Sequence, residues 1–420
     1  MNSSAKPALF LLPVYVGSLK YYEKLLPHLQ SKYEPTFLII RPDDDRRRGM
    51  LSYCRDRSLP FLVVDPGGES DFRVPFVSAV VKRIAHQKAC KAIFKNAPKA
   101  KLVAVKAIAG FEPIFKEANR QGLETIVIQS ALIPPPNFYR KDAGDTMPVF
   151  FYRVYHFFLS LVFAVSDLLT QGWSYIAAST HPRKVGVIGP EGIRIFKERY
   201  GFDPKTMTVV GTAEYERVSE LKMRVREDEE FRDGLIRKYG LDHNKKRILI
   251  LSVWFAHHGA VRPAQYYSTK EKERQITHYR RLIASVRAVC PAESYEVLFK
   301  LHPSEQNIYT SYETLDVRIF GDESISEELL VLSDLYIADP CTSANYMVVA
   351  SGVPAIFDNT ETLPALNKCA LFYPITKIVQ NIGEFQEAVD AFAKGGLSRG
   401  YDDTDIDCKS IERIARFIAS

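Results

Sequence analysis

The residues best placed for chemistry lie in the second half of the chain, where polar side chains directly follow short apolar runs. Phe299, Lys300 and Leu301 predict the end of a buried strand, and His302 and Pro303 come next. In open parallel sheets, ligands bind beyond the carboxyl ends of the strands. His302 is therefore a candidate to contact a nucleotide, although a histidine that is hydrogen-bonded within the core fits the pattern too.

Two hydroxyl residues follow another predicted strand. The run Leu335–Ala338 predicts that strand, and Thr342 and Ser343 then open a helix that ends before Gly352. Hydroxyl groups and the free backbone N–H groups of a helix start can bind a phosphate or another anion. Helix capping alone would also explain this pair.

A serine and an acid open the helix between these two strands. Ser326 is expected to cap the helix, and Glu327 is favourable in its first turn. Together with His302, Thr342 and Ser343, which follow strand ends of one sheet, they predict a site for a nucleotide monophosphate or diphosphate.

Aromatic and imidazole groups follow the first predicted strand of the second half. Trp254 can stack on a base or sugar, and His257 and His258 can meet a phosphate. Adjacent histidines point apart, and no acidic or cysteine partner lies at ligand spacing, so we expect no metal site.

The first half offers weaker candidates. Gly17 and Ser18 follow the first predicted strand and resemble a glycine turn that lets a bound substrate approach the backbone. Transfer of a group to a hydroxyl needs a base that takes the proton of this hydroxyl. Glu112, Glu191 and Asp44 are the catalytic candidates for this role, although each also fits as an ordinary residue at a helix start.

The elements that must position these residues form two series. The first half alternates apolar runs at 8–12, 36–40, 61–65, 101–105 and 125–129 with amphipathic helical stretches, and the same rhythm restarts after Gly211. Continuous apolar strands separated by such helices predict an α/β fold with doubly wound parallel sheets. With 420 residues, we expect domains at 1–212 and 213–400, hinged near residue 212, with a last helix at 401–420.

The second half resembles the donor domain of GT-B glycosyltransferases over roughly residues 205–395. The resemblance rests on K-L-H-P from Lys300, S-E-E-L-L from Ser326, the strand and T-S pair ending at Ser343, and S-G-V-P-A-I from Ser351. It is similar above all to the HP-motif sialyl- and Kdo-transferases and the CDP-glycerol polyolphosphate transferases of bacterial envelopes, and more distantly to UDP-GlcNAc 2-epimerase. Over the first half it is a resemblance of topology alone.

The resemblance implies a fold and specific roles. It implies two Rossmann-like domains that face each other across a cleft, with a last helix over 405–419 that crosses back to the first domain. It also implies that His302 contacts the nucleotide and that Thr342 and Ser343 hold phosphate. Two departures stand out: many relatives have a glutamate where 345–347 reads Asn-Tyr-Met, and a His-Gly where 129–132 reads Gln-Ser-Ala-Leu.

The charge and the cysteine content limit the partners and the compartment that we expect for this protein. The net charge of +6 is too small for a chain of 420 residues to indicate a nucleic-acid partner. It suits a phosphate-bearing substrate or an anionic membrane surface. Six cysteines without CxxC spacing, and no evident signal peptide, predict a cytoplasmic protein. The Phe-rich stretch 149–169 carries Arg153 and Asp167, which predicts an amphipathic helix that does not span a membrane.

These observations predict an enzyme: a GT-B glycosyltransferase that moves a sugar from a nucleotide donor to a cell-surface polysaccharide or glycolipid. No cofactor is expected, because the nucleotide-sugar, with CMP, CDP or UDP as its nucleotide, is a substrate. The expected partners are this donor, a glycan or lipid-linked acceptor and, as an open alternative, the membrane surface. A sugar-nucleotide 2-epimerase, a polyol-phosphate transferase and a non-catalytic nucleotide-binding or scaffold protein remain as alternatives.

Overall fold

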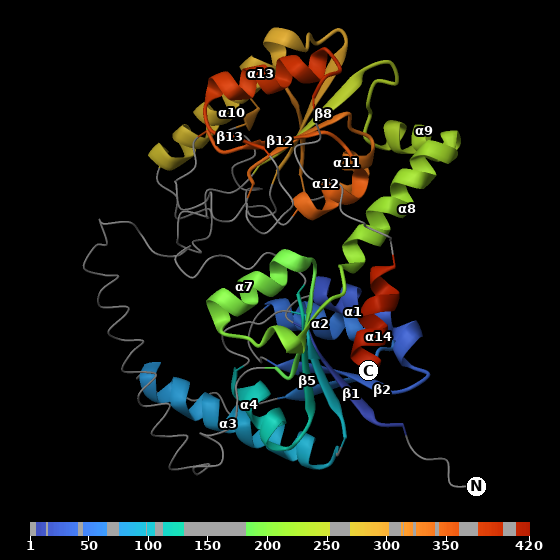
Figure 1. Ribbon diagram of the computed structural model, residues 1–420, viewed down its shortest axis with the longest axis vertical. Helices are drawn as coiled ribbons and strands as arrows, with labels where there is room; N and C mark the ends of the chain where they lie inside the picture. Colours follow the sequence, from blue (N-terminus) through green and yellow to red (C-terminus); the bar gives the residue numbers. More distant parts are fainter. Residues whose placement is uncertain are drawn as a thin grey trace. The chain divides into compact units, whose positions relative to one another are not determined.

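The computed structural model describes residues 6–13, 16–40, 45–64, 75–97, 99–105, 112–129, 182–252, 269–301, 312–313, 315–321, 325–340, 344–360, 377–397 and 409–420. These residues fall into two compact units (Figure 1). The first unit holds the described parts of 6–129, 182–213 and 409–420, and the second holds those of 214–397. We describe each unit by itself.

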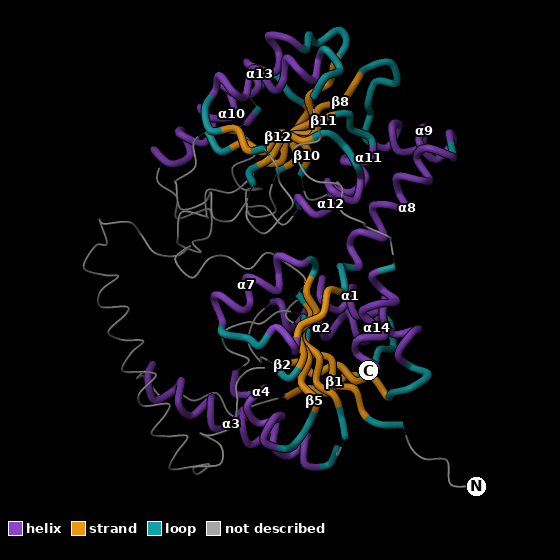
Figure 2. Tube along the Cα trace, in the orientation of Figure 1, coloured by secondary structure: helices purple, strands orange, loops and turns teal. Residues whose placement is uncertain are grey.

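The first unit is built on a parallel sheet with the strand order β3-β2-β1-β4-β5-β6-β7 (Figure 2). Its strands are β1 (Ala8–Leu12), β2 (Glu34–Ile40), β3 (Phe61–Val64), β4 (Lys101–Ala104), β5 (Glu124–Ile128), β6 (Lys184–Val187) and β7 (Met207–Val209). Successive side chains point to opposite faces of a strand. Leu9 and Leu11 accordingly belong to one hydrophobic core, and Phe10 and Leu12 to another. Both faces of this sheet are therefore buried.

Helices cover both faces of this first sheet. They are α1 (Val16–Leu29), α2 (Asp45–Asp56), α3 (Pro75–Lys95), α4 (Glu112–Arg120), α7 (Pro190–Tyr200) and α14 (Ser410–Ala419), with a 3-10 turn at Pro204–Thr206. Side chains of α1, α2 and α14 fill the core on one face, and side chains of α3 and α4 fill the core on the other.

The last helix returns to the first unit, as the sequence predicted. Ile414 and Ile418 on α14 are fully buried against α1, and the two helices lie side by side in Figure 1. The carbonyls of the last turn are held by the sheet: Lys101 Nζ donates to Ile418 O at 2.7 Å, and Tyr33 Oη donates to Ala419 O at 3.3 Å. The α14 helix is thus part of the hydrophobic core of this unit.

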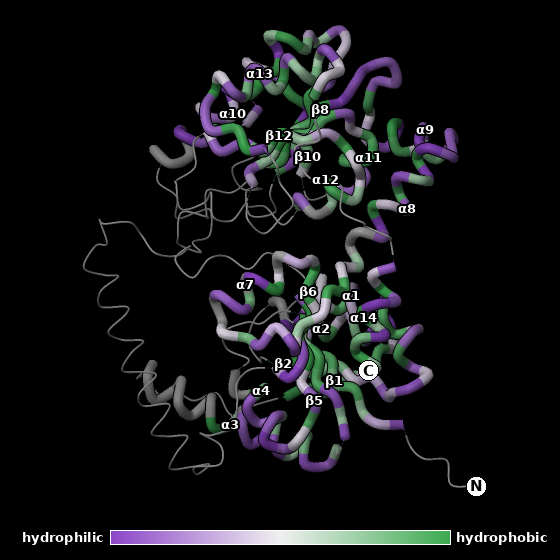
Figure 3. The backbone as a smooth tube through the Cα atoms, viewed as in Figure 1, coloured by the Kyte–Doolittle hydropathy of each residue, from purple (hydrophilic) through white to green (hydrophobic). Residues whose placement is uncertain are grey.

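The second unit contains another parallel sheet, with the order β10-β9-β8-β11-β12-β13. Its strands are β8 (Lys246–Leu251), β9 (Tyr295–Lys300), β10 (Arg318–Phe320), β11 (Leu335–Ala338), β12 (Ala355–Asp358) and β13 (Ile378–Val379). The strands of both sheets are the hydrophobic centre of each unit in Figure 3. The predicted α/β class with two doubly wound parallel sheets is therefore confirmed.

Helices also cover both faces of the second sheet. They are α8 (Ala213–Glu227), α9 (Glu229–Lys238), α10 (Thr269–Val289), α11 (Ser326–Val331), α12 (Asn345–Ser351) and α13 (Ile382–Ala393). Helices α10 and α13 pack on one face, and α9, α11 and α12 pack on the other. The charged stretch 214–239 reads as one continuous helix in the sequence, but it holds two helices, α8 and α9. Asp228 separates them because its Oδ1 accepts the Phe231 N–H at 2.8 Å and caps α9.

An ion-pair cluster at β5 makes the first unit sensitive to acid. Glu124 lies 2.8 Å from Lys101 Nζ and 2.6 Å from Lys184 Nζ. Burial raises the pKa of the Glu124 carboxyl, but the hydrogen bonds and charges of the two lysines outweigh this effect, so its pKa lies below the ordinary value.

Because the pKa of Glu124 is lowered by folding, its contribution to stability is complete above the unfolded pKa of about 4.3 and is lost as the pH falls through the folded pKa. We expect the wild type to be more stable than Glu124→Gln by a constant margin between pH 6 and 8, and the margin to shrink below about pH 4.3. Urea unfolding of both proteins at several pH values measures this. A margin that does not change on acidification would contradict it.

Candidate functional site

The strand order marks one edge of the second sheet as the place for a ligand. From β8 the chain runs to β9 and β10 on one side, and it returns to β11, β12 and β13 on the other. In such sheets, ligands bind beyond the carboxyl ends of the strands at the point where the order reverses. That point lies between β8 and β11.

The predicted nucleotide-binding residues follow the three central strands. Trp254, His257 and His258 come after β8, His302 and Pro303 after β9, and Thr342 and Ser343 after β11. All of them lie outside the described residues. The strands that precede them are neighbours in the order β9-β8-β11, so the chain enters all three segments from one edge of one sheet.

Backbone and side-chain bonds hold the carboxyl ends of β8, β9 and β10 together. The Ser252 N–H donates to Lys300 O at 2.9 Å, and the Leu301 N–H donates to Phe320 O at 2.9 Å. Lys300 is 5% exposed, and its Nζ donates to the carbonyl of Gly321. The hydrogen-bond ladder between these strands therefore extends past the strand ends. It fixes the backbone up to Leu301, the residue before His302.

Asn345 connects the start of α12 to strand β11 and to Asp339, which directly follows this strand. Its side chain is fully buried at the first residue of α12. Its Oδ1 accepts the Tyr336 hydroxyl at 3.1 Å, and its Nδ2 donates to Asp339 O at 3.0 Å. Asn345 lies in the stretch 345–347, where many of the GT-B transferases that the sequence resembles have a glutamate. Its side chain is engaged inside the unit, so here this position holds the strand end.

The prediction that Ser326 caps α11 is wrong. The N-cap residue is Ile325, and no side chain makes a capping bond there. The acids of this helix are bound instead: Glu328 accepts from Lys238 Nζ at 2.6 Å and from Tyr239 Oη at 2.5 Å, and Glu327 lies 3.8 Å from Arg217. The hydrogen bond to Glu328 raises the pKa of Lys238. These contacts fasten α11 to α8 and α9.

The candidates of the first unit occupy helix starts. Gly17 and Ser18 lie in the first turn of α1, and Ser18 is 3% exposed, so the predicted glycine turn is in fact the start of a helix. Glu112 is the first residue of α4, and Glu191 is the second residue of α7. Asp44 lies outside the described residues. The starts of α1 and α4 follow β1 and β4, between which the strand order of the first sheet reverses.

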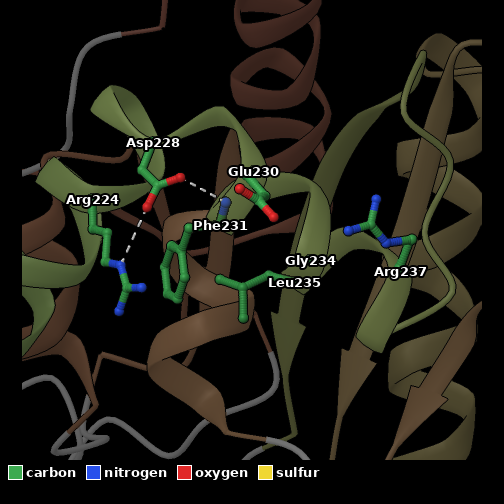
Figure 4. A pocket seen from close by; sticks show the side chains of 7 residues that line it. All are labelled: Arg224, Asp228, Glu230, Phe231, Gly234, Leu235 and Arg237. Carbon is green, nitrogen blue, oxygen red and sulfur yellow. Dashed lines mark hydrogen bonds and ion pairs between the residues drawn. The ribbon is translucent and has the colours of Figure 1, made fainter.

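A hollow of about 400 Å³ lies elsewhere, between α8 and α9 (Figure 4). The guanidinium of Arg224 stands 3.8 Å from the centre of the Phe231 ring and pairs with Asp228 at 3.7 Å. Helix α9 leads into the amino end of β8. None of the residues predicted to bind the nucleotide lines this hollow, whose lining comes from α8, α9 and Asp228 between them.

One buried pair of side chains was missed by sequence reasoning. His278 Nε2, on α10, lies 2.9 Å from Asp358 Oδ2 at the end of β12. Eighty residues separate the two in sequence, and the pattern of α10, which also buries Gln275 and Ser285, does not point to Asp358 as the partner.

A metal-binding cluster and a membrane-spanning helix are both absent from the described residues. No group of three or more His, Cys, Asp or Glu side chains in these residues is arranged to hold a metal ion. None of the helices in this part of the chain has the length and apolar character needed to cross a bilayer. The predicted amphipathic helix at 149–169 lies outside the described residues.

The fold is that of known sugar-nucleotide enzymes. The UDP-GlcNAc 2-epimerase of Methanocaldococcus jannaschii is 11% identical with a TM-score of 0.57, and that of Neisseria meningitidis, bound to UDP-GlcNAc, is 8% identical with a TM-score of 0.54; each match covers 99% of both chains. The wall teichoic acid polymerase TagF is 13% identical with a TM-score of 0.48, over 99% of this chain and 89% of that one. No protein-family model and no curated protein matches the sequence. The protein therefore has the GT-B fold.

Proposed function

We propose that this protein is an enzyme that binds a nucleotide-activated sugar at the carboxyl edge of its second sheet. One observation carries the proposal. The segments with Trp254, His302 and Thr342 all leave from neighbouring strands at the point where the strand order reverses. The GT-B fold, which the chain shares with an epimerase bound to UDP-GlcNAc, supports a sugar-nucleotide as the ligand.

Within this class we propose a glycosyltransferase. His302, Thr342 and Ser343 would meet the negative charge of the nucleotide phosphates, and this charge grows as the sugar leaves. The first unit would bind the acceptor, a glycan or a lipid-linked saccharide. Glu112, Glu191 and Asp44 are the candidates to take the proton from its hydroxyl group. We propose a boundary between acceptor and donor domains at residues 212–213, and the division of the described residues near residue 213 supports it.

An epimerase that changes the sugar of its nucleotide is the second candidate. Two epimerases match over 99% of both chains with TM-scores above 0.5, which favours a shared architecture. An epimerase converts its nucleotide-sugar without an acceptor, whereas a glycosyltransferase needs one. Incubation with UDP-GlcNAc alone, followed by chromatography of the sugar, separates the two.

The nucleotide itself can be identified by thermal unfolding with UDP-, CMP-, CDP- and GDP-linked sugars. We expect one donor to stabilise the protein, by about 2.7 kcal/mol at a hundred times its dissociation constant. The matched nucleoside without phosphate is the control, because the proposed site binds the phosphates. The absence of a shift with all four donors would favour a non-catalytic scaffold.

A further inference from the structure

A buried histidine and a buried aspartate join α10 to the carboxyl end of β12. His278 Nε2 lies 2.9 Å from Asp358 Oδ2, and the two side chains are 9% and 7% exposed. A carboxylate accepts hydrogen bonds, so His278 Nε2 carries the proton and donates it to Asp358. This hydrogen bond connects a helix to the place where the chain leaves the sheet.

The same aspartate also shapes the turn that follows. Its other oxygen, Oδ1, accepts the Thr360 N–H at 3.0 Å. On the opposite side, the Asn359 N–H donates to Val379 O at 2.9 Å, and Asn359 Nδ2 donates to Gln380 Oε1 at 2.7 Å. The turn 358–360 is thus held by α10 on one side and by β13 and the residue after it on the other.

Stability alone does not account for a polar pair at this position. The sequence neighbours Tyr279 and Ile356 belong to the hydrophobic core of the unit. Replacing both partners of a buried hydrogen bond by apolar groups of the same shape can be nearly neutral or stabilising, because no polar group is then left buried without a partner. What the pair supplies is a fixed geometry, since both atoms must meet at hydrogen-bond distance.

The turn lies at the edge that the proposed function assigns to the ligand. Strand β12 pairs with β11, and β11 borders β8 at the point where the strand order reverses. We propose that His278 and Asp358 are positioning residues that hold the turn 358–360 in the shape that contacts the sugar-nucleotide. This inference rests on the proposed function, and it assigns to these residues no contact with the reacting atoms.

Three variants of the full chain test the inference. His278→Leu removes the donor and keeps a side chain of similar bulk. His278→Gln keeps an N–H donor at a similar reach and is the rescue variant. Val286→Ala is the matched control: Val286 is fully buried on the same helix, two turns from His278, so its loss destabilises the unit without touching the turn.

The measurements are calorimetric affinity for UDP, CDP, CMP and UDP-GlcNAc, and hydrogen exchange of a peptide that spans the turn. For His278→Leu we expect about tenfold weaker binding, the lower end of the loss seen when a hydrogen-bond partner behind a metal ligand is removed, and faster exchange in the turn. We expect His278→Gln to regain most of the affinity. Val286→Ala should bind as the wild type does.

Each alternative result has its own meaning. Wild-type affinity in His278→Leu would overturn the positioning role and leave the proposed function intact. Equal weakening in Val286→Ala would also overturn it, because the effect would follow stability. If the wild type bound none of the four, the proposed function and the ligand-facing part of the inference would both fall. In that case, unchanged exchange of the turn in His278→Leu would overturn the structural part as well.

Discussion

Replacing Ile414 by alanine is expected to lower the free energy of unfolding of the first unit by about 2–5 kcal/mol. Ile414 is fully buried, and it contacts a core to which α1, α2 and the strands also contribute. The substitution removes three carbon atoms and leaves a cavity that neighbours held by a seven-stranded sheet cannot readily fill.

Urea unfolding followed by circular dichroism measures this loss, and Ile411→Ala is the matched control. Ile411 lies on the same helix and is only partly buried against the same core, so its loss should be clearly smaller. Equal stability of Ile414→Ala and the wild type would show that α14 does not contribute to the core. It would also remove the physical reason for the return of the chain to its first unit.

Replacing Asn345 by alanine is expected to lower the free energy of unfolding by about 2–4 kcal/mol, because it removes two hydrogen bonds and leaves a buried hydroxyl without this acceptor. The groups that lose this hydrogen bond are the Tyr336 hydroxyl, which is buried, and the Asp339 carbonyl. We also expect the base of the Thr342 and Ser343 segment to loosen, and nucleotide affinity to fall with it.

Asn345→Asp is the second variant for this prediction, because it changes one of the two hydrogen bonds and keeps the other. It keeps an oxygen that accepts from Tyr336 and loses the N–H that donates to Asp339 O, so it separates the two bonds. Urea unfolding gives the stability of both variants, and calorimetry with UDP and CDP gives their affinities. If Asn345→Ala were as stable as the wild type, Asn345 would have no structural role, and a direct role in ligand recognition would return as the better explanation.

The sequence predicted the sheets well because their strands are buried on both faces. Strand β1 was expected at 8–12 and is found at Ala8–Leu12, and the run over 36–40 lies within β2. A continuous apolar run needs no knowledge of its neighbours to be recognised. The return of α14 was predictable for another reason, since it came from the resemblance to GT-B enzymes and is confirmed by the buried face of that helix.

Two helix starts differ from what the sequence predicted. The break between α8 and α9 depends on the Asp228 carboxylate, which caps a helix inside a continuous helical pattern. The expected cap at Ser326 is absent, and residues nearly ninety positions away hold this helix start instead. Lys238 and Tyr239 both donate to Glu328, and the Tyr239 hydroxyl also accepts the Ile325 N–H. The Asp228 cap has the local spacing of an N-cap, but it stands inside a continuous helical pattern that hides it. The contacts to Glu328 and Ile325 span 86 to 90 positions and have no spacing that could reveal them.

The candidate site shows the same division. The sequence predicted which strand ends carry it, and the strand order brings β9, β8 and β11 together. It did not predict that Asn345 is turned into the protein or that His278 reaches Asp358. These contacts depend on how α12 and α10 lie on the sheet, which hydrophobic periodicity does not specify.

Calorimetric titration of the full chain with UDP, CDP, CMP and UDP-GlcNAc, repeated with His302→Ala, tests most directly whether the second sheet binds a nucleotide. We expect at least one of the four to bind to the wild type. We also expect His302→Ala to weaken this binding while the unfolding temperature stays the same. Binding of none of them by the wild type would contradict a nucleotide site on the second sheet, and an affinity unchanged by His302→Ala would contradict the placement of the nucleotide beyond β9.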